Sequence, residues 1–477
     1  MERLCRPPHN LSATSAQLLV HWLRGFSTFS TEGTCDLGAV EWKTYKQSPI
    51  KLLASQHPYQ CRYVNGIGSV WGRGLLSEQK APLASQRSMF TLVGLTLFAM
   101  VASNMITPTL YLYAAELGAS LAFIGLIASA ASGVRLLSRV PMGLLSDRFG
   151  RRPLIRLGTF GVVGSLLMLY LALAPSQVLI AYVVNTLAFM SIFTIGLTMA
   201  SEIYSARKAT GVSLFALSSS LAMFIAPGIC GLLLLQFRIR ETYLFASLIG
   251  LGGLLCSTRV AASPGSRASL SIRGSLGNVL KDENIRFAAV LETFFALGFN
   301  SIFIFLPLYL SERYQLTSAE ISFLVAIYSL AMVSIRLPLP KLLQRIEEKR
   351  LTALAFLEYA VALMAMPFGS SLIHFSVLLF AAGMAHGMIF PSMALVVSRS
   401  SHLDLALANS VYLGVGDMVT VIAPPVIVSF IQAFGYSSIY PAASIGMLIG
   451  VAYAVIRGRK HTLFEHGGKS LSEILRP

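Results

Sequence analysis

Long apolar runs separated by short polar turns are the feature that most constrains how this chain folds. A helix needs about 18 or more apolar residues to cross the hydrocarbon core of a bilayer. Only 12% of the residues are charged, against about 25% in soluble domains, so polar surface is too scarce to enclose a water-soluble globule. We therefore expect an all-α integral membrane protein with twelve transmembrane helices, at residues 89–113, 120–145, 153–174, 177–203, 211–236, 241–260, 286–311, 317–343, 350–371, 374–399, 406–433 and 436–457.

The apolar part of the chain repeats itself. Adding 197 to a residue number takes four residues to identical residues, Ile124 to Ile321, Arg139 to Arg336, Arg148 to Arg345 and Pro227 to Pro424. The longest inner connection, residues 261–285, is basic and rich in Ser and Gly, as a linker would be. The sequence thus predicts two pseudo-symmetric six-helix halves, residues 89–260 and 286–458.

Residues 1–88 differ from the rest of the chain. They are mixed in character, hold all three tryptophans, and contain neither a run long enough to span a bilayer nor a signal-peptide pattern. We expect either a poorly ordered extension or a reading frame that starts upstream of the true start. Residues 459–477 are expected to form a cytoplasmic tail.

The formal charge of +16 is concentrated in particular loops. If both termini are cytoplasmic, thirteen lysines and arginines fall on inner loops and helix ends, and only Arg238, Arg240 and Arg313 fall on outer loops. This asymmetry predicts a multi-pass protein of the plasma or inner membrane with both termini inside. Because no basic run with interleaved aromatics appears outside the loops, the expected partner of the positive charge is the lipid bilayer and not nucleic acid.

One short charged turn, GLLSDRFGRRP at residues 143–153, lies between the second and third apolar runs. It resembles the signature loop of the major facilitator superfamily, and we call it the signature loop. A plain positive-inside signal is the alternative, but the ordered spacing favours the family: Gly143, Asp147, Arg148, Gly150, Arg151 and Arg152.

The resemblance implies a role for each part of this loop. Gly143 would let a neighbouring helix approach closely. Asp147 would face the N-terminus of the eleventh helix, near residues 406–409, where the helix dipole favours a carboxylate, and would latch the inner side shut. The three arginines would hold the loop at lipid headgroups or pair with acids. The second copy has Gln344 in place of the aspartate and Glu347 in place of Gly150, so the latch is expected on one side only.

Ionisable residues inside apolar runs mark a second candidate site, because they are costly in lipid and usually face a cavity or a partner. Burial favours the neutral form of a carboxyl group, so Glu292 and Asp417 are candidate proton sites. The arginines would neutralise these acids or bind an anionic substrate bidentately. Helix-to-helix ion pairing is an equal alternative for the arginines, which are Arg135, Arg139 and Arg336.

Two features depart from the family pattern. Proton-coupled members often carry an arginine early in the fourth helix, where this chain has Asn185. Antiporters often show GPxxGG in the fifth helix, where this chain reads APGICG and keeps Pro227 and Gly231. Together with Pro424, these two residues are expected to permit helix bends.

The predicted function is secondary transport of a small organic molecule by alternating access. We expect a monomeric, bacterial drug- or metabolite-efflux-like antiporter driven by the proton gradient, with a cavity lined by helices one, two, four and five and seven, eight, ten and eleven. Neither the cysteines nor the histidines show a metal-ligand or catalytic spacing, so no cofactor, metal or enzymatic activity is expected. The alternatives are a sugar or organic-anion importer or uniporter, a non-transporting membrane sensor and, last, a membrane enzyme.

Overall fold

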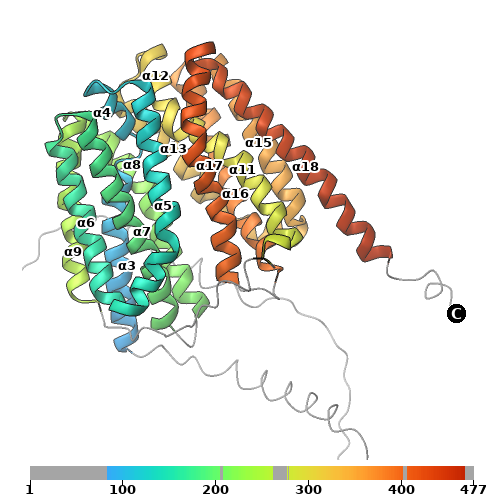
Figure 1. Cartoon of the computed structure of the whole chain (residues 1–477), viewed down its shortest axis with the longest axis horizontal. Coiled ribbons are helices and arrows are strands. Elements are labelled where there is room, and N and C mark those ends of the chain that lie inside the picture. The colour runs from blue at the N-terminus through green and yellow to red at the C-terminus, as the bar shows by residue number, and fades with distance from the viewer. Residues whose placement is uncertain (1–82, 205–207, 261–276, 278, 401–404, 468–477) are drawn as a thin grey trace, which may run out of the picture. The chain divides into compact units, whose positions relative to one another are not determined.

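The computed structural model describes residues 83–204, 208–260, 277, 279–400 and 405–467. Within these ranges the chain forms helices and turns and no strand (Figure 1). The predictions for residues 1–82, for most of the linker and for the last ten residues lie outside the described part. Several predicted boundaries differ from the structure. The first helix starts at Leu83, and the last continues to Gly467, so the expected tail is partly helical. The predicted continuous helix at 317–343 is wrong: it ends at Arg336, and a short helix follows at Leu339–Arg345, because Pro338 lies between them.

The first half contains seven helices, of which the first two share one predicted span. The predicted continuous helix at 89–113 is wrong: it breaks after Asn104 and resumes at Leu110. Pro108 lies in the break, and a proline lacks an N–H and disfavours helical geometry in the preceding residue. The helices are α3 (Leu83–Asn104), α4 (Leu110–Glu116), α5 (Leu121–Phe149), α6 (Arg151–Leu171), α7 (Pro175–Ile203), α8 (Lys208–Leu234) and α9 (Ile239–Thr258).

The second half repeats this order. Its first span contains a π-helical turn, η2 (Ser301–Phe305), and adding 197 places residues 105–108 of the first break on this turn. The first helix of each half is therefore irregular at the same level. The elements are α11 (Glu283–Asn300), η2, α12 (Leu306–Tyr314), α13 (Ser318–Arg336), α14 (Leu339–Arg345), α15 (Glu348–Ala365), η3 (Met366–Phe368), α16 (Leu372–Ser398), α17 (Leu405–Phe434), η4 (Tyr436–Ser438) and α18 (Ile439–Gly467).

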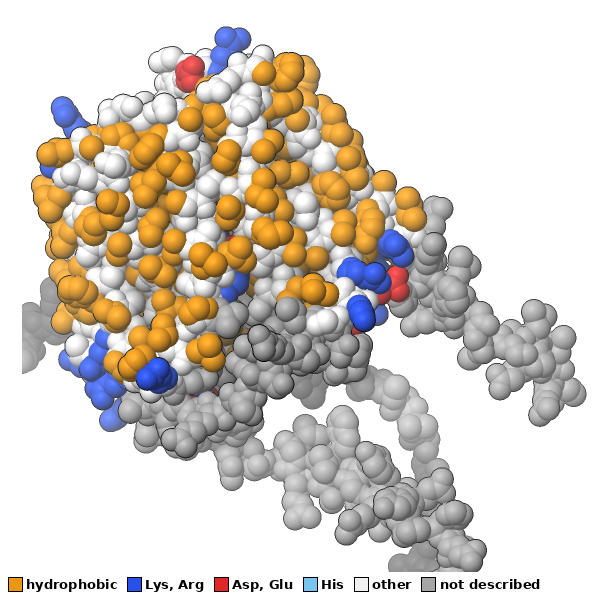
Figure 2. Space-filling view, viewed as in Figure 1, with side chains coloured by type: hydrophobic (Ala, Val, Ile, Leu, Met, Phe, Trp, Pro, Cys, Tyr) orange, Lys and Arg blue, Asp and Glu red, His pale blue; other side chains and the backbone are white. Residues whose placement is uncertain are grey.

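Eleven helices of the described residues are long and apolar enough to cross a membrane. The remaining predicted span is the first, whose apolar length is divided between α3 and α4 by the break. The eleven spans and this divided first span together support the expected all-α fold of about twelve membrane helices. Figure 2 shows apolar side chains spread over the middle of the visible face, with Lys and Arg gathered toward its ends, as lipid contact requires.

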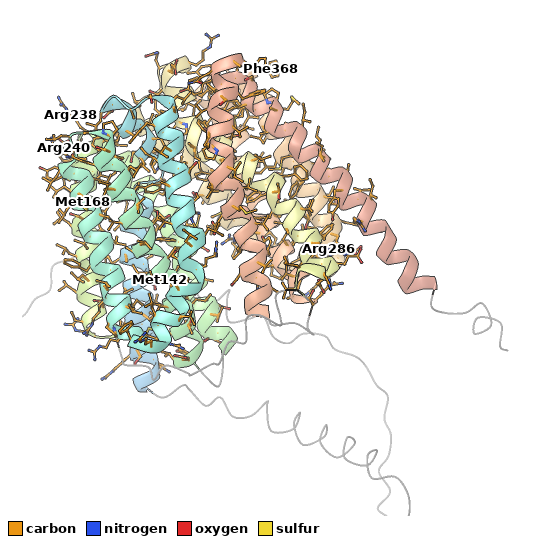
Figure 3. The ribbon with its side chains drawn as sticks, viewed as in Figure 1. Met142, Met168, Arg238, Arg240, Arg286 and Phe368 are labelled. Atoms are coloured by element: carbon orange, nitrogen blue, oxygen red, sulfur yellow. The ribbon has the colours of Figure 1, made fainter. Side chains whose placement is uncertain are left out.

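The ends of the bundle can be told apart by labelled side chains. In Figure 3, Arg238, Arg240 and Phe368 lie at one end, and Met142 and Arg286 lie toward the other. We call the first the α4/α12 end and the second the signature-loop end.

The two halves meet along two helix pairs, α5 with α17 and α8 with α13. Glycines allow close approach in both. A Cβ on Gly125 would lie 3.1 Å from the Val428 side chain, and a Cβ on Gly231 would lie 2.9 Å from the Phe323 ring. Since 231 plus 197 is 428, both contacts involve the same repeat position. The structure thus gives Gly231 a packing role, and α8 and α17 continue as helices through Pro227 and Pro424.

The closest helix contact inside the second half joins α13 to α16. Gly383 and Gly387 lie four residues apart on α16 and face the backbone of α13 at Tyr328 and Met332. Small residues at this spacing let membrane helices pack backbone to backbone.

Replacing Gly383 by alanine is expected to lower the free energy of unfolding by about 1–3 kcal/mol, because the added methyl collides with a carbonyl group that cannot move away. Thermal unfolding in detergent, followed by size-exclusion chromatography, measures the loss. Gly164→Ala is the matched control, since a Cβ at Gly164 meets nothing within 4 Å among the described residues. Equal melting temperatures for the two variants would contradict the packing role.

Candidate functional site

A cavity of about 230 Å³ lies between the halves. Its lining comes from α3, α4, α5, α7 and α8 on one side and from α11, η2, α13 and α17 on the other. These are the expected helices, except that α16, the tenth span, supplies none of the lining residues. Both irregular first spans face the cavity, through Ile106 and Thr107 in one half and Phe303 and Ile304 in the other.

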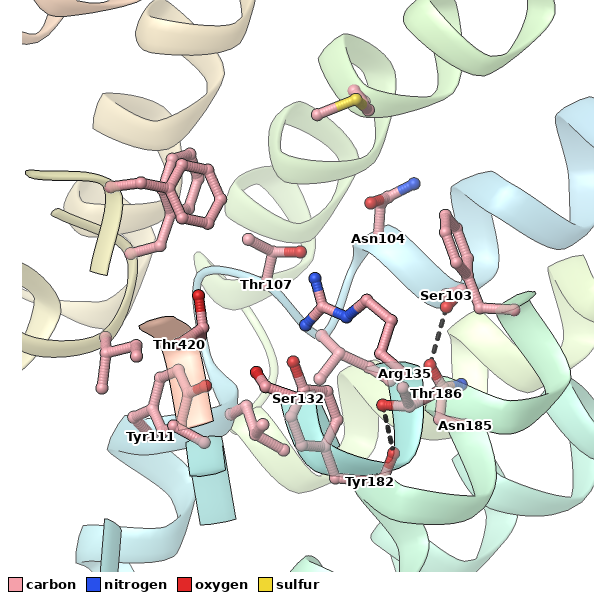
Figure 4. A pocket seen from close by; sticks show the side chains of 18 of the residues that line it. Ser103, Asn104, Thr107, Tyr111, Ser132, Arg135, Tyr182, Asn185, Thr186 and Thr420 are labelled. Atoms are coloured by element: carbon pink, nitrogen blue, oxygen red, sulfur yellow. Dashed lines mark hydrogen bonds between the residues drawn. The ribbon is translucent and has the colours of Figure 1, made fainter. Parts of the chain in front are cut away.

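The cavity combines polar groups with aromatic rings. Figure 4 shows the Arg135 side chain extending among hydroxyl and amide groups, with Asn104 and Thr107 on one side and Ser132 and Tyr182 on the other. Phe299 and Phe303 of the second half complete the lining. Such a surface suits a molecule that has both polar and apolar parts.

Asn185 acts as a link between three helices. Ser103 of α3 donates a hydrogen bond to its Oδ1 at 2.7 Å, and its Nδ2 donates to Ser165 Oγ of α6 at 2.9 Å (Figure 4 shows the first). Asn185 is therefore part of a buried polar network inside the first half. It occupies the position where proton-coupled members often have an arginine.

Two arginines of α5 share one acid of α17. Arg139 Nε donates to Asp417 Oδ2 at 2.5 Å, and Arg135 Nε lies 3.6 Å from Asp417 Oδ1. The Asp417 side chain is 6% exposed, that of Arg135 is 34% exposed and that of Arg139 is 21% exposed. The structure thus brings together three of the five predicted site residues as an ion-pair cluster that joins the halves.

Glu292 lies on α11 beside this cluster. It is buried, and its Oε1 would lie 2.5 Å from a Cβ on Gly416, so only glycine leaves room for it. Its electrostatic neighbours are Tyr412, Asp417 and Arg139, and among the described residues no group donates a hydrogen bond to its Oε2. Two acids and two arginines thus share a small, mostly buried space.

The fifth predicted residue, Arg336, makes a separate contact between the halves. Its Nη1 donates to Ser220 Oγ of α8 at 2.7 Å. Since 139 plus 197 is 336 and 220 plus 197 is 417, this contact is the repeat equivalent of the Arg139–Asp417 ion pair. Ser220 was missed by sequence reasoning, although adding the repeat offset to it would have pointed to Asp417.

The signature loop is held by contacts within the first half. Arg151 is buried and forms an ion pair with Glu202 of α7. Arg152 donates to the Thr258 carbonyl at the end of α9 at 3.0 Å. Arg148 is exposed and lies over the ring of Phe149. Of the two roles expected for these arginines, Arg151 shows the pairing with an acid, and Arg152 ties the loop to the end of α9.

The glycines of this loop differ in role. Gly150 has a φ of 85°, which other residues rarely adopt, so it makes the turn from α5 to α6 possible. A Cβ on Gly143 would meet nothing within 4 Å among the described residues, so the close helix approach expected there stays a prediction. The side chains of Asp147 and of residues 405–407, and residues 401–404 altogether, lie outside what the structure describes, and the latch stays a prediction.

Two pseudo-symmetric bundles around a polar cavity, with charged contacts at their junction, define the class of secondary membrane transporters. Family comparison agrees: the model of the Major Facilitator Superfamily matches residues 92–315 and 288–473. The chain belongs to this superfamily.

Individual relatives are distant. An uncharacterized MFS-type transporter of Methanocaldococcus jannaschii is 23% identical over 274 residues, which cover 55% of this chain and 69% of the relative. The structure of a mutant of the nucleoside transporter NupG matches with a TM-score of 0.68 at 12% identity, covering 77% of this chain and 99% of that one. The human organic anion transporter MFSD10 matches with a TM-score of 0.58 at 17% identity, covering 78% and 99%. At such identities the structural matches establish the fold alone.

Replacing Asp417 by asparagine is expected to destabilise the protein by about 1.5–3 kcal/mol, because a charged hydrogen bond is lost and two arginines remain without their acid. Adding Arg139→Gln should restore part of the loss. A double-mutant cycle of melting temperatures measures the coupling between the two residues. Strictly additive effects would mean that the ion pair contributes nothing.

Proposed function

We propose that the chain moves a small organic molecule across the membrane by alternating access and exports it in exchange for protons. The observation that carries the proposal is the polar cavity at the junction of two pseudo-symmetric halves. A site between rocking halves can be exposed to either side in turn without opening a continuous pore.

The contacts around the cavity fit such rocking. Along α5 and α17 the described contacts run from Gly125 and Val428 at the α4/α12 end to Arg139 and Asp417 beside the cavity. Rocking must separate at least part of this seam. An interface made of glycine contacts and one ion-pair cluster is suited to such separation, because few hydrogen bonds are lost when the two helices move apart.

Glu292 is the best candidate for the coupled proton. A buried carboxyl group costs less when neutral than when ionised without a full set of hydrogen bonds. With both acids ionised, Arg135 and Arg139 balance Glu292 and Asp417, and a proton on Glu292 leaves the cluster at +1. The proton would thereby change the electrostatic energy of the contact that joins the halves.

The proposed export direction rests on Pro227 and Gly231, which the antiporter-like stretch retains. The proposed orientation in the plasma membrane rests on the basic loops, which favour a cytoplasmic location for the signature-loop end. A second candidate is an organic-anion importer or uniporter. Asn185 in place of the family arginine favours it, and so does Arg336, which meets the neutral Ser220 and forms no ion pair with a described carboxylate.

Inverted vesicles with an imposed proton gradient and a pH-sensitive dye test the proposal, with a panel of dyes, drugs, sugars and organic acids as solutes. One solute class should collapse the gradient in the wild type. Glu292→Gln should abolish this response while solute counterflow persists, since exchange of solute for solute needs no proton.

Glu358→Gln is the matched control, because Glu358 is an acid in an apolar helix that does not line the cavity. It should respond as the wild type does. If no solute collapses the gradient but labelled solute enters right-side-out vesicles, proton-coupled export is wrong and the importing or uniporting candidate replaces it.

A further inference from the structure

The two contacts that the internal repeat makes equivalent carry different charges. In one, Arg139 of α5 meets the carboxylate of Asp417; in the other, Arg336 of α13 meets the neutral hydroxyl of Ser220. We propose that Arg336, at its contact with Ser220, binds the anionic group, a carboxylate or a phosphate, of the transported molecule. This inference rests on the proposed transport function and names its substrate class.

The Arg139–Asp417 contact shows what an arginine at this repeat position can bind. A carboxylate accepts two hydrogen bonds from one guanidinium group, and a serine oxygen is a weaker, uncharged acceptor on a shorter side chain. Ser220 engages only Nη1 of Arg336. Nε of Arg336 is buried and has no hydrogen-bond partner among the described residues. The anion would therefore accept hydrogen bonds from Arg336, as the Asp417 carboxylate does from Arg139.

The charges of the region support an anion. Arg135 and Arg139 are matched by Asp417 and Glu292, whereas Arg336 forms no ion pair with any described carboxylate. The nearby His386 adds no negative charge, since an imidazole is either neutral or cationic. An arginine inside a membrane segment is costly, and a bound anion would offset that cost.

The place of the contact relative to the cavity suggests the shape of the ligand. Ser220 precedes the lining residue Met223 by about one helical turn. Arg336 follows the lining residue Ser329 by about two turns, or about 10 Å along α13. Both side chains are partly exposed. An anionic group at Arg336 would thus leave the body of the molecule in the cavity, against Phe299 and Phe303. The ligand is an amphipathic organic anion with an aromatic or aliphatic body.

Ligand-induced stabilisation tests the site without requiring transport. The purified full-length protein is heated with benzoate, phenyl phosphate or neutral benzyl alcohol at constant ionic strength set with chloride. Benzoate or phenyl phosphate should raise the melting temperature of the wild type, and the larger shift tells which anion is preferred. Benzyl alcohol should not raise it.

Variants of the contact locate the binding. Ser220→Asp supplies an internal carboxylate and should weaken anion binding by about tenfold or more, as should Arg336→Gln. Ser220→Ala frees the guanidinium and should keep binding. Ser219→Asp is the matched control: it adds the same charge next door, where the native hydroxyl bonds only its own helix, and should keep most of the shift.

Three results would overturn the inference: equal shifts with benzoate and benzyl alcohol, an unchanged benzoate shift in Ser220→Asp and Arg336→Gln, or equal losses in Ser220→Asp and Ser219→Asp. The outcome is separable from that of the proposed function. Anion binding at Arg336 without any flux in vesicles would remove the transport proposal and leave the site. Flux of neutral solutes that Ser220→Asp does not reduce would leave transport and remove the site.

Discussion

A backbone inside lipid must satisfy its own hydrogen bonds, and this constraint shapes the whole molecule. Helices meet it automatically, so irregular backbone is tolerated only beside a cavity or within protein. Both irregular first spans obey this rule. The break at residues 105–109 keeps turn hydrogen bonds such as Thr107 N–H to the Asn104 carbonyl, and its residues line the cavity, as do those of the π-helical turn Ser301–Phe305. The cavity thus lies where the helical regularity of both repeats is interrupted.

The two halves resemble each other more in the geometry of their helix pairs than in the charges of the contacts between them. The helix pairs α5 with α17 and α8 with α13 are equivalent under the repeat, and each carries an arginine contact at the same position. One contact has an acid and the other a serine. If both contacts had an acid, two equivalent ion pairs would join the halves. The asymmetric pair leaves one arginine available, so the difference between the copies is where a ligand can act.

The signature loop illustrates how one charged segment serves its own half. Arg151 and Arg152 reach α7 and α9, so the turn at Gly150 is fixed to the helices of the first bundle. A loop that is rigid relative to its bundle moves with it as one body. Rocking of the halves would therefore act at contacts that connect the bundles, such as Arg139–Asp417, and would leave the loop's own contacts with α7 and α9 unchanged.

The sequence by itself determined the helical class, most span boundaries and the repeat, because apolar length and periodicity are local properties. It also identified the charged residues inside spans, because each is costly there whatever its partner. Only the tertiary structure decided partners: that Arg135 and Arg139 share Asp417, that Arg336 meets Ser220, that Gly231 packs against Phe323 and that Gly143 packs against nothing described. Partnership depends on the rotation of each helix and on contacts between residues far apart in the sequence, such as Arg336 and Ser220. Local sequence patterns do not encode these.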